Sequence, residues 1–120
     1  MSAQLGAIAF AREQPERAKQ LCEAALEYLQ GSEDYSGTAT VWGQLAAIAL
    51  RGSDLAEAKR CYEQALELTR KVGNALFEAQ ILMQMAQVAE QAHQPRQAEE
   101  NYVQALRIYQ EHNVRQAVGV

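Results

Sequence analysis

The hydrophobic positions along the chain follow the period of amphipathic helices. Leu45, Ile48 and Ala49 show the i, i+3, i+4 spacing of one helix face, and the segment that follows repeats this pattern. Gly, Pro and Asp residues separate such segments, and none of the segments has the alternation of a strand. The sequence therefore predicts an all-α chain, with helices at 2–12, 15–30, 37–51, 54–72, 75–92 and 95–111.

The residues between these helices favour tight turns within pairs of helices. Pro15 and Pro95 suit the first turn of a helix, where the missing N–H needs no partner. Asp54 is an expected N-cap, and Glu57 follows three residues later as in a capping box. Connections at 31–37 and 73–74 separate one pair from the next. The helices are thus expected to form hairpins.

The same residue types recur every 40 residues, which is the mark of a repeat protein. Chance does not produce this many matching columns in a single register. We therefore expect one domain over 1–120, with repeats at about 1–36, 37–74 and 75–112, and with 113–120 as the start of a further helix or as a capping tail. The matching columns are Gln4/Gln44/Gln84, Ala9/Ala49/Ala89, Ala18/Ala58/Ala98, Ala25/Ala65/Ala105 and Leu26/Leu66/Leu106.

Small residues inside each hairpin have a characteristic spacing. In the middle repeat Ala46, Ala58 and Ala65 are separated by twelve and seven residues, Tyr62 lies between the last two, and Trp42 precedes them. This pattern resembles the tetratricopeptide repeat, in its long-period form known from kinesin light chains. The resemblance implies a right-handed superhelix of three helix-turn-helix hairpins. HEAT or armadillo repeats, the alternative fold, share the 40-residue length but lack this small-residue pattern.

Composition and charge narrow the classes of function. The net charge is −4, and no basic cluster is present, so we expect neither a nucleic-acid partner nor a membrane partner. No run of 18 or more apolar residues could span a bilayer. Cys22 and Cys61 have no metal-type spacing, and Met1 is followed by no basic segment. We therefore expect a protein of the reducing cytoplasm.

The sequence offers no catalytic constellation. Asp34 and Asp54 fall where helix caps are expected, and His93 and His112 lack metal-ligand spacing. Cys22 shares its column with tyrosines, so an inert buried thiol is expected there. We predict a protein without enzymatic activity, metal or cofactor.

The resemblance implies that the first helix of each repeat lines a concave binding face. Glutamine amides on this face could pair with the N–H and C=O groups of an extended peptide, although they could instead bond neighbouring helices. A Lys, Arg and Asn clamp for a terminal carboxylate is missing. The expected peptide-binding residues are Gln4, Ala7, Thr40, Gly43, Gln44, Ala47, Arg51, Gln80, Met83, Gln84, Gln87 and Gln91.

Together these features predict a protein–protein interaction module that binds an extended peptide or partner segment. The alternative is a regulatory, sensor or packing segment of a larger multidomain signalling protein. We also expect the chain to be a piece of a longer array, because its last helix carries Val103 and Tyr109 on an outer face. Residues 114–118, or a second copy of the chain, should cover this apolar surface.

Overall fold

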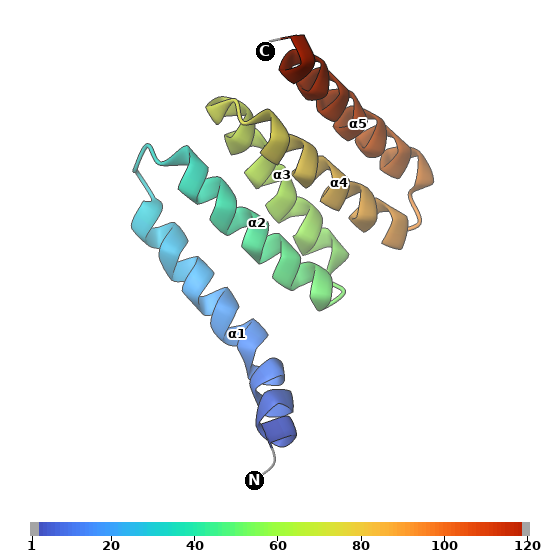
Figure 1. The fold of residues 1–120 in the computed structure, drawn as a ribbon. Helices are drawn as coiled ribbons and strands as arrows, with labels where there is room; N and C mark the ends of the chain where they lie inside the picture. The colour runs from blue at the N-terminus through green and yellow to red at the C-terminus, as the bar shows by residue number, and fades with distance from the viewer. Residues whose placement is uncertain (1–2, 119–120) are drawn as a thin grey trace.

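The protein is a stack of helices that pack in chain order. The computed structural model describes residues 3–118, and side chains within residues 15–113. Its helices are α1 (Ala3–Leu29), α2 (Tyr35–Arg51), α3 (Leu55–Val72), α4 (Ala75–Gln91) and α5 (Pro95–Val118), as Figure 1 shows. The described residues contain no strand, so the all-α prediction is confirmed. None of these helices is long and apolar enough to cross a membrane.

Two helix hairpins form the body of the molecule. The helix α2 packs along α3, α4 packs along α5, and α3 joins the two hairpins by packing against α4. Alanines of the predicted small-residue columns are fully buried where the helices meet, among them Ala46, Ala58, Ala65 and Ala105. A methyl side chain at these points lets two backbones approach closely, so the columns have the packing role that their spacing predicted.

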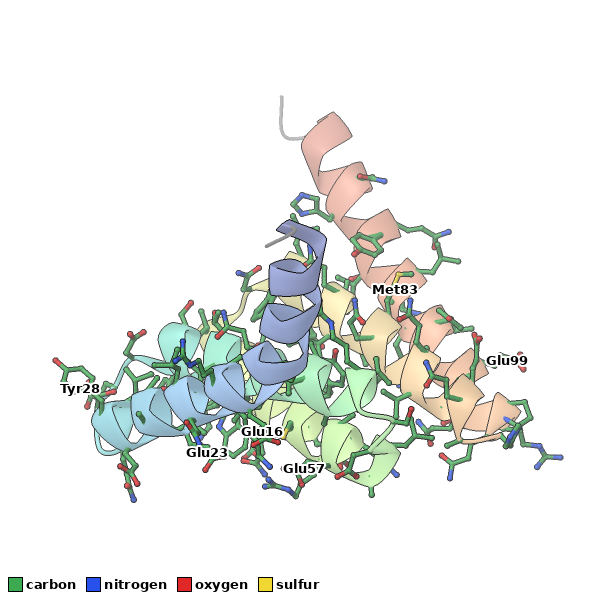
Figure 2. The ribbon with its side chains drawn as sticks, turned by 90° about the horizontal axis from the view of Figure 1, so that it is seen from below. Glu16, Glu23, Tyr28, Glu57, Met83 and Glu99 are labelled. Carbon is green, nitrogen blue, oxygen red and sulfur yellow. The ribbon has the colours of Figure 1, made fainter. Side chains whose placement is uncertain are left out.

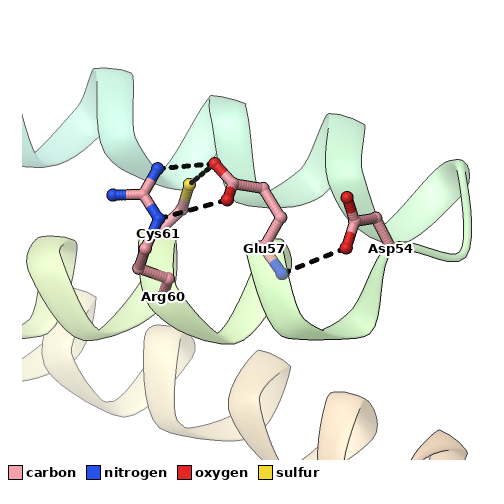
Figure 3. A network of polar contacts seen from close by, with 4 residues as sticks. All are labelled: Asp54, Glu57, Arg60 and Cys61. Atoms are coloured by element: carbon pink, nitrogen blue, oxygen red, sulfur yellow. Dashed lines mark hydrogen bonds and ion pairs between the residues drawn. The ribbon is translucent and has the colours of Figure 1, made fainter.

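Short polar side chains cap the N-terminal ends of helices. The carboxylate of Asp34 accepts the Gly37 N–H at 2.9 Å, and that of Asp54 accepts the Glu57 N–H at 3.2 Å. Both predicted caps are confirmed. The capping box is only half formed, because the Glu57 carboxylate turns to Arg60 Nη2 at 2.6 Å and to the Cys61 thiol at 3.5 Å (Figure 3).

The first repeat differs from the prediction of two helices at 2–12 and 15–30. One helix, α1, runs from Ala3 to Leu29 with Pro15 inside it. In the later repeats the tight turn contains Ser53 or His93 with a positive φ of about 60°. The equivalent residue is Glu13, a good helix former that is poorly suited to this conformation. The backbone therefore stays helical across Pro15, and α1 bends there (Figure 2).

The C-terminal segment also differs from the prediction. The helix α5 continues to Val118, so residues 113–118 neither start a separate helix nor fold back. The helix α3 ends because Gly73 takes a φ of 81° and Asn74 caps the next helix, whereas the equivalent positions hold Asn113 and Val114. Valine has no side-chain acceptor that could cap a new helix.

The outer face of α5 carries exposed apolar side chains among charged ones, although they are not the pair that the sequence suggested. Val103 is 46% exposed, as predicted. Tyr109 is half-buried against the core, and Leu106 is exposed in its place.

Candidate functional site

A groove lies between the two first helices of the hairpins. The helices α2 and α4 form its walls, and α3 lies beneath it. Its volume is about 320 Å³. The lining residues are Thr40, Gly43, Gln44 and Ala47 of α2, Tyr62 of α3, and Phe77, Gln80, Ile81 and Gln84 of α4.

Helical spacing places these residues on matching faces. Thr40, Gln44 and Ala47 follow an i, i+4, i+7 pattern, which keeps side chains on one stripe of a helix. The residues forty positions later, Gln80 and Gln84, belong to the same pattern on α4. Both stripes line the groove, one from α2 and the other from α4.

The walls carry amides that are accessible to a ligand. Gln44, Gln80 and Gln84 are exposed to solvent. The side-chain oxygen of Gln44 accepts a long hydrogen bond from the Cys22 thiol at 3.6 Å, so this amide also ties α1 to α2. Its NH₂ group still offers two donors. Gln44 thus bonds a neighbouring helix through its oxygen and can still bind a peptide through its NH₂ group, so both roles expected for these glutamines apply to it.

The floor of the groove is apolar and neutral. Tyr62 and Ile81 are 4% and 3% exposed. Burial raises the pKa of the Tyr62 phenol, which is therefore uncharged at neutral pH. The groove is lined without any charged side chain among the described residues. It is suited to an uncharged peptide segment whose backbone groups face the polar walls and whose apolar side chain contacts the floor.

Gly43 keeps part of the groove open. A methyl group built at this position would meet no atom within 4 Å. The glycine is therefore not required for helix packing. Its effect is to leave space beside Gln44.

The structure brings together half of the predicted binding residues. Arg51 lies in a separate hollow between α1 and α2, while Met83, Gln87 and Gln91 are exposed on α4 outside the groove. Figure 2 shows Met83 on the opposite side of the molecule from Glu57. The side chains of Gln4 and Ala7 lie outside the described residues. The predicted residues that line the groove are Thr40, Gly43, Gln44, Ala47, Gln80 and Gln84.

The apolar part of the groove was not predicted from the sequence. Tyr62 was noted there only as part of the small-residue pattern, although it also lines the groove. Phe77 and Ile81 each precede a wall glutamine by three residues, which places them on nearly the same helix face. That spacing was the signal that could have found them.

A second kind of hollow occurs twice, in equivalent places of successive repeats. One lies between α1 and α2 and measures about 330 Å³, and the other lies between α3 and α4 and measures about 380 Å³. The two hollows are thus related by the forty-residue period of the sequence. The equivalent lining pairs are Pro15/Leu55, Glu16/Ala56, Lys19/Lys59, Leu45/Met85, Ile48/Val88, Ala49/Ala89, Gly52/Ala92, Asp54/Gln94 and Glu57/Gln97.

The two thiols are buried and protonated. Burial raises the pKa of Cys22, and it raises that of Cys61 to about 11, with the hydrogen bond to Glu57 acting in the same direction. Thiolates are the reactive form, so neither group is activated as a nucleophile. Among the residues that the structure describes, no three potential ligands cluster around a metal site.

Aromatic and basic side chains join the helices α2 and α3 of one hairpin. The Arg60 guanidinium of α3 lies 5.5 Å from the ring centre of Trp42 on α2, and the Lys71 ammonium lies 5.4 Å from that of Tyr35. Such cation–π contacts hold the two helices of a hairpin in register.

Comparison with protein-family models decides the assignment. The tetratricopeptide repeat model matches residues 1–71 and again residues 37–111. The chain belongs to the tetratricopeptide repeat family. Tetratricopeptide repeats generally mediate protein–protein interactions and are typically non-enzymatic. Comparisons with curated proteins and with solved structures return no significant match.

Proposed function

We propose that this chain is an interaction module that binds an extended peptide segment in the groove between α2 and α4. The observation that carries the proposal is the groove itself, because six residues expected to bind a peptide line one hollow. Right-handed stacking of the repeats and a cytoplasmic setting belong to the same proposal.

The chemistry of the groove favours recognition of a main chain. An amide side chain donates and accepts, so Gln44 on one wall and Gln80 and Gln84 on the other match the N–H and C=O groups of an extended segment. The floor of Tyr62 and Ile81 favours one apolar side chain of the ligand. The ligand segment is therefore uncharged and extended, with an apolar residue near its centre.

The alternative is that the chain is a packing or regulatory segment of a larger protein. Exposed apolar residues on α1 and α5, such as Tyr28 and Leu106, favour it. In that case the outer helices would carry the contacts, and changes in the groove would have little effect on binding.

A random-sequence peptide library selected on the chain provides the probe. We expect Gln84→Ala to weaken the affinity of a selected peptide, measured by calorimetry, by about 0.5–1.5 kcal/mol, the net value of a typical hydrogen bond. Gly43→Leu should abolish binding, because its side chain would occupy the groove at a position where an added Cβ meets no atom within 4 Å. Gln104→Ala, an exposed amide on α5, is the matched control.

Unchanged affinity in both Gly43→Leu and Gln84→Ala would exclude the groove as the binding site. Equal loss in the Gln104→Ala control would point instead to α5, as the alternative function requires.

A further inference from the structure

One face of α1 is apolar and strongly exposed. Leu21 is 71% exposed and Tyr28 is 88% exposed. The two residues are seven positions apart, which is two helical turns, so they lie on the same face. Figure 2 shows Tyr28 pointing away from the body of the molecule.

The repeat register identifies what is missing from this face. The residue equivalent to Leu21 is Cys61 in α3 and Asn101 in α5, and these are 1% and 5% exposed. In both later repeats the first helix of the hairpin packs along the second, α2 on α3 and α4 on α5. The helix α1 contacts α2 of the next repeat but has no first helix of its own repeat folded against it, and we attribute the exposure of Leu21 and Tyr28 to this difference.

The chain itself contains a helix of the required type. The segment 3–12 has the same residues as α2 at five equivalent positions. Yet this segment continues α1 along the same helix, which at 27 residues is about 40 Å long. It cannot cover the Leu21 face of its own chain while α1 is continuous. The equivalent pairs are Gln4/Gln44, Leu5/Leu45, Ala7/Ala47, Ile8/Ile48 and Ala9/Ala49.

We propose that two copies of the chain exchange these segments. Residues 3–12 of each copy pack on the Leu21–Tyr28 face of the other, in the place that α2 occupies on α3. The exchange is reciprocal, so it closes as a twofold dimer and leaves neither copy of this face exposed. Pro15, inside α1, is the point at which the exchanging segment joins the body.

The exchange also affects the groove, a consequence that rests on the proposed function. The partner's Gln4 would occupy the position before Gln44 and Gln84 in the glutamine column. The dimer would therefore present a longer row of amides than one chain can form alone.

The oligomeric state tests the proposal without any peptide. Light scattering after size exclusion should give twice the 13.3 kDa mass of one chain. The double variant Leu21→Glu with Tyr28→Glu should raise the dimer dissociation constant by at least about tenfold, since it buries charge in the contact. Gln20→Glu with Gln30→Glu adds the same charge at exposed positions outside this face and should leave the dimer intact.

A second variant changes the hinge instead of the face. Glu13→Gly places glycine where the later repeats have a positive φ, so it favours an internal turn and should give a monomer with the same helix content. Pro15→Ala favours a continuous helix and should keep the dimer.

Three results would overturn the exchange. These are a monomer at every concentration of the unmodified chain, a dimer insensitive to the Leu21 and Tyr28 changes, and growth beyond the dimer. The last would indicate an open, head-to-tail contact through α5.

Discussion

Among single residues, Cys61 shows most clearly how the surroundings of a side chain decide its protonation state. It is 1% exposed, and its thiol donates to the Glu57 carboxylate, which two bonds from Arg60 also hold (Figure 3). The bond from Arg60 lowers the pKa of Glu57, so the carboxylate stays charged and the thiol stays protonated.

This arrangement predicts an alkaline loss of stability. The pKa of Cys61 is about 11 in the folded protein, against 9.0 for an ordinary thiol. The folded state holds the proton longer than the unfolded chain, so the stabilisation is complete below pH 9.0 and is lost as the pH rises towards 11. Urea unfolding midpoints across this range should fall more steeply for the unmodified protein than for Cys61→Ala. Parallel curves would contradict the prediction.

Among the elements, the helix ends depend on backbone conformation as much as on side chains. The helix α3 ends at Gly73, which has a φ of 81° and donates its N–H to the Thr69 carbonyl at 2.9 Å. Gly43 lies inside α2. A methyl group would meet nothing within 4 Å at either site, so the two glycines differ in conformation and not in available space.

The same substitution should therefore have opposite effects at these two positions. Gly73→Ala should destabilise the protein by about 1–2 kcal/mol, because alanine is strained in the left-handed region. Gly43→Ala should stabilise it by about 0.5–1 kcal/mol, because alanine is the better residue inside a helix. Chemical denaturation of both variants measures the difference. Changes of the same sign would show that packing and not backbone conformation decides both.

On the scale of the whole molecule, burial is concentrated in the central helices. The largest fully buried side chains are Leu82, Thr69 and Cys61, which belong to α3 and α4. Each of these helices packs extensively against two neighbours, whereas the extensive packing of α5 in the described part of the chain is against α4. In a stack of repeats, each unit is stabilised by its immediate neighbours.

Hydrogen exchange should follow this order. Backbone amides of α3 and α4 should exchange more slowly than those in the second half of α5, because opening α5 exposes less apolar surface. Exchange measured by NMR in low concentrations of urea tests this, with the central helices opening at higher urea than α5. Equal protection along the whole stack would instead indicate a single cooperative unit.

The sequence determined by itself the features that depend on local chemistry. Asp34 and Asp54 are helix caps because a short carboxylate before a helix finds a free N–H three residues later. Ala58 and Ala65 are buried like their equivalents Ala98 and Ala105, and Gln44 and Gln84 share one groove, because the forty-residue period places equivalent residues on the equivalent face of each repeat. These features require only neighbours that lie close in the sequence or at equivalent places in the repeat.

Only the tertiary structure decided the features for which the sequence allows two conformations or two surroundings. Pro15 is compatible with a new helix and with a bend inside one, and the balance depends on whether Glu13 accepts the strained turn. Tyr62 belongs to the core and also lines the groove, which its place in a repeat column cannot reveal. In each case the local preferences are small, and the packing of whole helices supplies the larger free energy that selects the outcome.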